Sequence, residues 1–234
     1  MNLDHQKQRE IVLKLAYSDL LTFNQLWDKK EDSNKLAYHL NRLVKLGLAK
    51  KSKNGYSLTE RGKALTAFLD TKGVETTFPT LAYIVLVKNN GRLLCQERLK
   101  QPFKTLHSFP SGQVPFGTTA HDAARNGLLE QTGIRVDKLR HKGIEEIKTF
   151  EGEQLLYHHI LLIFETESTD IQLKQTPKAK NLWLTAKEYL AKKRFPDIAL
   201  PEIIHSHSFI IASGERYMHN GEFTGAKILN KTVS

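Results

Sequence analysis

The chain has 234 residues, of which 40% are hydrophobic and 26% charged, an ordinary composition for a globular protein. No stretch approaches the roughly 18 continuous apolar residues of a membrane span, and the first residues lack a signal-peptide pattern, so we expect a cytoplasmic protein without a membrane partner. The single cysteine, Cys95, excludes an intrachain disulfide and a multi-cysteine zinc site. The formal net charge is +10, and residues 1–73 carry 14 Lys and Arg against 8 Asp and Glu, which gives them +6.

The first 70 residues predict three helices, a hairpin and a fourth helix. Apolar residues recur at helical spacing over residues 4–17, and Thr22 opens a capping box with Gln25 for a short second helix. Asp32 or Ser33 can cap a third helix that runs to residue 46. The Asn54-Gly55 pair predicts a hairpin turn, after which Thr59 can cap the last helix.

This order resembles the winged helix-turn-helix of bacterial and archaeal regulators, and residues 35–48 and 55–62 carry the resemblance. It implies a DNA-binding domain over residues 1–72, with a recognition helix that enters the major groove and a basic wing that reaches phosphates. Solvated polar faces, or a module that binds another protein, are the alternatives. The residues expected to contact double-stranded DNA are Ser33, Asn34, Lys35, Tyr38, His39, Arg42, Lys50, Lys51 and Lys53.

After an expected linker at residues 73–80, the pattern changes to strands. Residues 81–87 and 92–98 predict a hairpin around a turn at 89–91, and Thr118 can cap a helix that ends at Gly133. Strands are expected at 142–150, 154–165 and 181–184, and helices at 185–193 and 198–209. Residues 213–234 predict a C-terminal tail or hairpin. The expected class is therefore α+β, in two domains.

The second domain resembles the Nudix hydrolases. Gly112 and Gly133 have the spacing of the two glycines of the Nudix box, and residues 109–112 resemble the Leu-Pro-Gly-Gly that precedes it. Arg98 matches a basic residue common on the preceding strand of the family, and Trp183-Leu184 resembles a late motif. The resemblance implies a Nudix-like α/β/α sandwich with a mixed sheet over residues 81–212.

Most of the family's metal-binding carboxylates are replaced in this box. Thr118, Gly127 and Gln131 stand where the family has Glu, and Glu130 is the one carboxylate left on the helix face shared by positions 127, 130 and 131. Mg²⁺ and Mn²⁺ are held by oxygen ligands, chiefly carboxylates. We therefore expect no cofactor, and we assign no catalytic residue. Glu130 is the metal and catalytic candidate only if hydrolysis survives.

The two halves together predict a ligand-gated transcription regulator. Nudix-related regulators join the same two kinds of domain, usually with the winged helix after the Nudix-like part, whereas here it comes first. We expect a homodimer whose Nudix-like cleft senses a small nucleotide or sugar-phosphate metabolite through Arg98, Gln113, Glu130 and Gln131. The alternatives are an active nucleoside diphosphate hydrolase with unconventional Mg²⁺ or Mn²⁺ ligands and an accessory winged helix, and a protein-interaction module.

Overall fold

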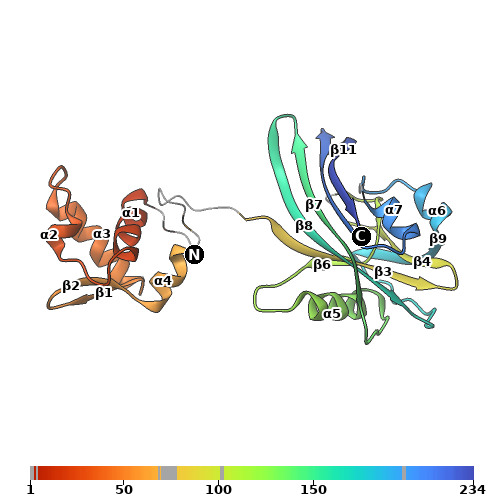
Figure 1. Ribbon diagram of the computed structural model, residues 1–234, viewed down its shortest axis with the longest axis horizontal. Coiled ribbons are helices and arrows are strands. Elements are labelled where there is room, and N and C mark those ends of the chain that lie inside the picture. Colours follow the sequence, from red (N-terminus) through yellow and green to blue (C-terminus); the bar gives the residue numbers. More distant parts are fainter. Residues whose placement is uncertain (1–2, 4, 68, 70–77, 101–102, 197–198) are drawn as a thin grey trace. The chain divides into compact units, whose positions relative to one another are not determined.

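The computed structural model divides the chain into two compact units, Met1–Thr77 and Phe78–Ser234 (Figure 1). It describes residues 3, 5–67, 69, 78–100, 103–196 and 199–234. Most of the expected linker at 73–80 therefore lies outside the described residues, and the first strand of the second unit already begins at Thr80. In the part of the chain that is described, no helix combines the length and apolar character needed to cross a membrane.

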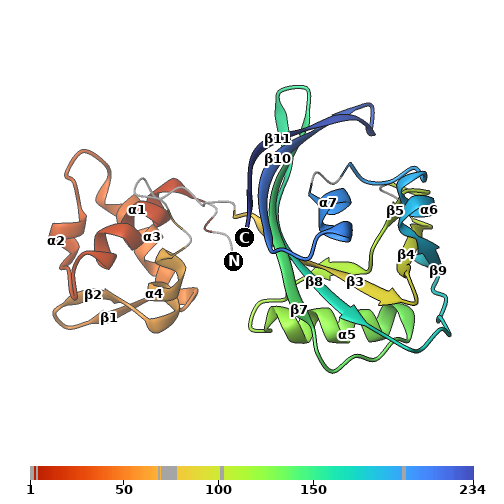
Figure 2. The same cartoon turned by 45° about the vertical axis from the view of Figure 1, so that its right-hand side comes forward.

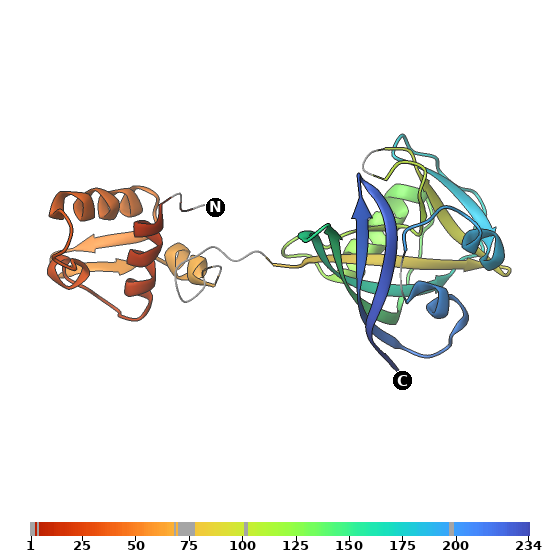
Figure 3. The same ribbon diagram turned by 90° about the horizontal axis from the view of Figure 1, so that it is seen from above.

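The first unit has the element order that its capping residues predict. The side chain of Thr22 accepts from the backbone of Gln25 in a complete capping box, and Asp32 and Thr59 cap the third and fourth helices. Figure 3 shows the helices gathered around the two-stranded hairpin. The elements are α1 (Gln6–Ala16), α2 (Phe23–Leu26), α3 (Ser33–Lys45), β1 (Ala49–Ser52), β2 (Gly55–Leu58) and α4 (Glu60–Thr66).

One hydrophobic core holds this unit together. On α3 the buried face comprises Leu36, Leu40 and Leu43, which are each fully buried. It belongs to the same cluster as Ile11 and Leu15 of α1 and as residues of both hairpin strands. Burial of each such side chain contributes about 1.5–3 kcal/mol, so the unit has a core of its own rather than depending on the second unit.

Nine described strands of the second unit form a mixed sheet. Its order is β11-β10-β7-β8-β3-β4-β5, with β6 paired to β3 and β9 paired to β4. The pairs β10–β7 and β3–β8 are parallel. The elements are β3 (Thr80–Asn89), β4 (Arg92–Arg98), β5 (His107–Ser108), β6 (Ser111–Gln113), α5 (Ala120–Thr132), β7 (Arg140–Glu151), β8 (Gln154–Glu167), β9 (Ala179–Thr185), α6 (Ala186–Leu190), α7 (Leu200–His205), β10 (Ile210–His219) and β11 (Glu222–Val233).

Strand β3 shows why this sheet is covered on both faces. Ala82, Ile84 and Leu86 belong to the core that includes residues of α6 and α7, whereas the alternate residues Tyr83 and Val85 belong to the core with α5. Side chains alternate across a strand, so a continuous apolar run feeds two cores. Figure 2 shows α5 on one side of β3 and α7 on the other. The expected α/β/α arrangement with a mixed sheet is confirmed.

Three details of the second unit differ from expectation. Thr119, not Thr118, caps α5, because its side chain accepts from the backbone of Asp122. The predicted hairpin of residues 81–87 with 92–98 is only partly formed: β3 and β4 pair at two positions and then separate, since β3 continues along β6 and β4 along β9. Strand β10 (Ile210–His219) runs across the expected domain boundary at 212, and the second unit continues to Ser234.

Residues 210–233 form an antiparallel hairpin at the edge of the sheet, which settles the alternatives for the C-terminal segment. Strand β10 lies parallel to β7 and antiparallel to β11, and both strands appear in dark blue in Figure 3. The side chains of β10 alternate between buried and more exposed positions. The hairpin is therefore an integral part of the second unit rather than a frayed end.

Candidate functional site

Helix α3 presents a polar surface opposite its buried face. Asn34, Lys35, Tyr38 and Arg42 are exposed, and Tyr38 keeps 65% of its accessible surface. Ser33 is half-buried next to the capping residue Asp32, whose side chain accepts from the backbone of Asn34. These side chains are polar, and they come from successive turns of one helix. They are available to an external partner such as the edges of bases.

His39 does not belong to that surface. Its ring is 8% exposed and lies 4.3 Å, between ring centroids, from the ring of His5. Burial, followed by the charge of His5, lowers the pKa of His39. The expectation that His39 lies on the outer face is therefore wrong. Residue 39 follows Leu36 by three positions, so helical geometry turns it toward the core.

The hairpin carries the second group of cations. Lys50 and Lys51 on β1 and Lys53 in the turn are all exposed. The ammonium of Lys51 lies 5.7 Å from the centre of the Tyr56 ring, its neighbour across the strands. The hairpin thus offers positive charge on a short, well-defined element, which suits contacts with phosphates.

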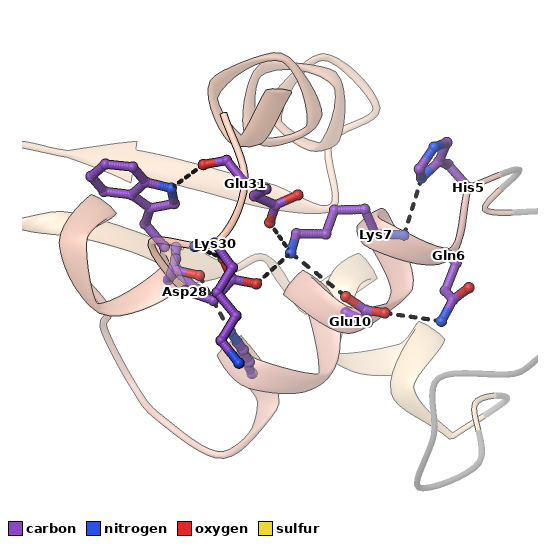
Figure 4. A network of polar contacts seen from close by, with 10 residues as sticks. His5, Gln6, Lys7, Glu10, Asp28, Lys30 and Glu31 are labelled. Atoms are coloured by element: carbon purple, nitrogen blue, oxygen red, sulfur yellow. Dashed lines mark hydrogen bonds and ion pairs between the residues drawn. The ribbon is translucent and has the colours of Figure 1, made fainter. Parts of the chain in front are cut away.

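A network of ion pairs fixes the segment that precedes α3. The Lys7 ammonium of α1 pairs with Glu10, Asp28 and Glu31, as Figure 4 shows. Burial lowers the pKa of Lys7, but the hydrogen bond and charge of Glu31 and the other two carboxylates raise it overall. The Trp27 indole donates to the backbone oxygen of Glu31 at 2.8 Å. The positive charge of Lys7 is therefore compensated by carboxylates of the same unit.

In the second unit, Tyr83 occupies the space in front of Gly127 on α5. A Cβ atom added at Gly127 would lie 1.7 Å from the Tyr83 hydroxyl oxygen, far inside van der Waals contact. Burial, followed by the charge of Glu130, raises the pKa of Tyr83, while a hydrogen bond from Gln131 lowers it. The phenol therefore stands, protonated at neutral pH, where a side chain at position 127 would project.

Gln131 completes this polar contact. Its amide nitrogen donates to the backbone oxygen of Ser111 at 3.1 Å and to the Tyr83 hydroxyl at 3.4 Å. Glu130, one residue earlier, is exposed, and the Lys174 ammonium donates to its backbone oxygen at 3.1 Å. Positions 127 and 131 thus lie on the face of α5 that contacts Tyr83, as helical spacing predicts. Two neutral groups, the Tyr83 phenol and the Gln131 amide, occupy that face.

The residues present do not fit a divalent metal ion at this position. Within the described ranges, no group of three or more His, Cys, Asp or Glu side chains is placed to hold a metal ion. A divalent cation needs oxygen ligands that carry negative charge, chiefly carboxylates. Here one carboxylate, Glu130, stands beside an amide and a phenol, and Gly127 has no room for a second.

Two neighbouring cavities, each of about 560 Å³, open beside α5. Arg98, Lys100, Ser108 and Ser111 line both of them. Glu130 and Gln131 line the first cavity, and Gln113 lines the second. The structure therefore brings all four expected ligand-binding residues to one region of the second unit, with Arg98 at the boundary between the two cavities.

Several residues that line the two cavities were not predicted from the sequence. The first cavity also has Lys174 and Lys178 from the segment before β9. The second has Phe103, Phe195 and Phe223, which are 92 and 28 positions apart in sequence, and Arg216. They come from loops and from the C-terminal hairpin, so no local spacing connects them.

The lone thiol is excluded as a nucleophile by its surroundings. Cys95 is fully buried in the middle of β4, and burial raises its pKa to about 12. A thiol with such a pKa carries almost no thiolate at neutral pH. Cys95 therefore acts as a small core residue.

Comparison with known structures supports the fold of the second unit. A MutT protein from Bacillus halodurans has a TM-score of 0.53 at 18% identity, and the match covers 64% of this chain and 97% of that one. The NUDIX domain of Shewanella oneidensis NrtR complexed with ADP ribose has 0.47 and 14%, with 63% and 97% covered. A MutT NUDIX hydrolase from Burkholderia pseudomallei has 0.46 and 12%, with 56% and 99% covered.

No curated protein matches the chain. The model of the NUDIX domain family matches residues 78–202, which is more than half of the 234 residues and includes most of the residues that line the two cavities. This chain belongs to the NUDIX domain family.

Proposed function

We propose that the protein is a DNA-binding transcription regulator whose NUDIX domain senses a nucleotide or sugar-phosphate metabolite without hydrolysing it. The observation that carries the proposal is the contact between Gly127 and Tyr83: the helix face that bears the metal-binding carboxylates in the active Nudix pattern is filled here by a phenol and the amide of Gln131. A cleft that keeps its shape while losing its metal ligands is suited to binding without turnover.

The first unit supports the DNA-binding half of the proposal. Its element order is the one expected for a winged helix, in which the exposed face of α3 would serve as the recognition helix and the exposed lysines of β1 and the turn as the wing. Side chains such as Asn34 and Arg42 can bond base edges, and Lys50, Lys51 and Lys53 can contact phosphates. A homodimer would place two such helices about 34 Å apart, one duplex turn.

Regulation would follow from differential affinity. A ligand in the NUDIX cleft shifts the population between two arrangements of a dimer only as far as it binds one arrangement more tightly than the other. The ligand contacts that we expect are Arg98, Gln113, Glu130 and Gln131, which the structure brings to the same pair of cavities.

Retardation of a duplex from the region upstream of the protein's own gene tests DNA binding. We expect retardation that weakens with salt. Lys51→Ala should bind more weakly with a salt slope lower by about one, because it removes a phosphate contact, whereas Arg42→Ala should bind more weakly and discriminate less between sequences, because it removes a base contact. Lys187→Ala on α6, an exposed lysine in the other unit, is the control and should bind like wild type. Equal weakening by Lys187→Ala, or no retardation, would count against DNA binding through α3 and the hairpin.

Membership of the NUDIX family supports the second candidate, an active hydrolase with unconventional ligands around Glu130. Phosphate release from nucleoside diphosphate derivatives with Mg²⁺ or Mn²⁺ tests it. Turnover that Glu130→Ala abolishes would replace sensing by hydrolysis, whereas its absence in both wild type and variant supports the regulator.

A further inference from the structure

The sheet of the second unit ends on one side in a long strand. Strand β11 spans Glu222–Val233 and lies at one end of the strand order, and among the described strands it pairs with β10 alone. The other end of the same order is the two-residue strand β5. Short edge strands and edge prolines limit pairing with other chains, but β11 has twelve residues and no proline. The outer edge of β11 is therefore open to a further strand.

The hydrogen bonds of the C-terminal hairpin show which backbone groups face this open edge. Phe209 and Ser234 lie opposite each other and exchange both backbone hydrogen bonds, at 2.9 and 3.0 Å. Opposite residues in an antiparallel pair of strands alternate between bonded and non-bonded pairs, so Val233 and Lys231 belong to non-bonded pairs with β10. The N–H and C=O groups of Val233 and Lys231 therefore point away from β10, toward the open edge.

Three apolar side chains of β11 are exposed. Ile228, Leu229 and Val233 keep 47%, 44% and 48% of their accessible surface. Val233 lies opposite Ile210 of β10, so the two side chains share a face of the sheet, yet Ile210 is fully buried in the core that includes residues of α7. The apolar face of the hairpin thus continues onto β11, beyond the part that the helices cover. Apolar side chains beside an open row of backbone groups favour burial against another strand.

The two lysines of β11 have acidic neighbours in the same unit. The Lys231 ammonium pairs with Glu202 of α7 at 2.6 Å, and Lys227 lies opposite Glu215 of β10. Like charges that face each other across two strands are destabilising. Because the positive charges of β11 are already compensated, an identical strand beside it meets little repulsion. The charge of this edge is therefore compatible with a second copy of the chain.

We propose that β11 pairs antiparallel with β11 of a second copy about a two-fold axis, which joins the two sheets into one. A two-fold contact brings the same strand from both copies together and uses both open edges, so the assembly closes at a dimer. The inference rests on the proposed function, which invokes two recognition helices in one dimer, and it names the surface that joins the copies. The same hairpin lines the second cavity through Arg216 and Phe223, so the cavity and the dimer contact share one element.

Sedimentation equilibrium of the full chain tests this inference, at concentrations from about 1 to about 100 μM, which cover micromolar dissociation constants. We expect a monomer–dimer equilibrium. Ile228→Lys places a charge at the open edge and should raise the dissociation constant of the dimer about tenfold or more. Ile171→Lys is the matched control, because it makes the same change at a 66% exposed position before β9, and it should leave the dimer unchanged.

Val233→Pro tests the backbone pairing itself. Proline removes the N–H group that faces the open edge but no hydrogen bond to β10, so it should weaken the dimer more than Val233→Ala, which keeps that N–H. In hydrogen exchange, the amides of Lys231 and Val233 should exchange about tenfold more slowly in the wild-type dimer than in Ile228→Lys, because the second copy accepts from them. Thermal melts of each variant establish that it is folded.

Three results would overturn the inference: a monomer over the whole concentration range, which leaves the edge to a strand of another protein; a dimer that Ile228→Lys and Val233→Pro do not weaken; or equal weakening by Ile228→Lys and Ile171→Lys. DNA retardation by the same preparations separates this inference from the proposed function. If a monomeric chain retards DNA, the dimer contact fails while the DNA-binding half stands. If the chain pairs through β11 and DNA does not bind, the opposite holds.

Discussion

The two units differ in how far apart in the sequence their decisive contacts lie. In the first unit the caps join residues two or three positions apart, as in Thr22 with Gln25 and Asp32 with Asn34. In the second, Tyr83 meets Gly127, and Phe103 meets Phe223, across the sheet. Local contacts follow from sequence pattern, whereas distant contacts follow from topology. The first unit could therefore be outlined from the sequence, but the shape of the NUDIX cleft could not.

The largest effect is expected from the core of the first unit. Leu40→Ala should lower the unfolding free energy of that unit by about 2–5 kcal/mol, because Leu40 is fully buried and the change leaves a cavity. The chain has one Trp in each unit, so urea unfolding followed by Trp27 fluorescence in a Trp183→Phe background reports the first unit. Asn41→Ala, at an exposed position on the same helix, should shift it by less than about 0.5 kcal/mol.

Leu40→Ala also tests whether the two units fold independently. Trp183 fluorescence in a Trp27→Phe background should show an unchanged second transition, since each unit has its own hydrophobic core. A shift of both transitions by the same amount would show that the units do not fold independently.

A side chain at position 127 should be costly because of Tyr83. Gly127→Ala should lower the unfolding free energy of the NUDIX domain by about 1–3 kcal/mol, through overpacking against the hydroxyl. Tyr83→Phe should reduce that loss in a double-mutant cycle, since it removes the nearest atom. Gly225→Ala, where nothing lies within 4 Å, should cost little. Additive effects of Gly127→Ala and Tyr83→Phe would show that the two positions do not interact.

This coupling also bears on attempts to restore the metal site. A carboxylate introduced by Gly127→Glu alone should give no Mg²⁺-dependent turnover, because the phenol already fills its space. Phosphate release after Gly127→Glu with Tyr83 intact would contradict the steric argument.

A smaller effect is expected where α5 begins. Thr119→Ala should lower the unfolding free energy of the NUDIX domain by about 1 kcal/mol, because the Thr119 hydroxyl accepts from the backbone of Asp122 at 3.1 Å. The adjacent Thr118→Ala is the matched control and should be near neutral, as Thr118 is exposed and precedes the cap. Similar losses for both variants would place the start of the helix one residue earlier.

The smallest effect is a pH dependence of the first unit. Burial, and then the charge of His5, lowers the pKa of His39 below its ordinary 6.5, while Glu31 acts in the opposite direction and Lys7 in the same one. Between the lowered pKa and 6.5 the unfolded chain binds more protons, so stability is present above that window and is lost as pH falls through it. His39→Gln should flatten this dependence in urea unfolding followed by Trp27, whereas His219→Gln, in the other unit, should not.

His39 also shows where sequence reasoning had enough information and used it wrongly. Its position three residues after Leu36 and one before Leu40 places it at the buried face of α3, but its polarity suggested the outer face. Thr119 is similar: two adjacent threonines offered the same cap, and only the backbone geometry distinguishes them. In both cases the local sequence left two possibilities: two faces of α3 for His39, and two adjacent threonines as the cap of α5.

Residue types and spacings were enough to predict the order of elements in the first unit, the two glycines that frame the NUDIX helix and the loss of its carboxylates at Thr118, Gly127 and Gln131. Each of these is encoded in residue type and spacing within one or two elements. The folded chain was needed to show that Tyr83 fills the space before Gly127, and that Arg216 and Phe223 of the last hairpin join Arg98 and Phe103 at one cavity. The parallel pairing of β10 with β7 places Arg216 beside Thr149 at that cavity, and parallel strands are not joined by a short turn that the sequence would reveal.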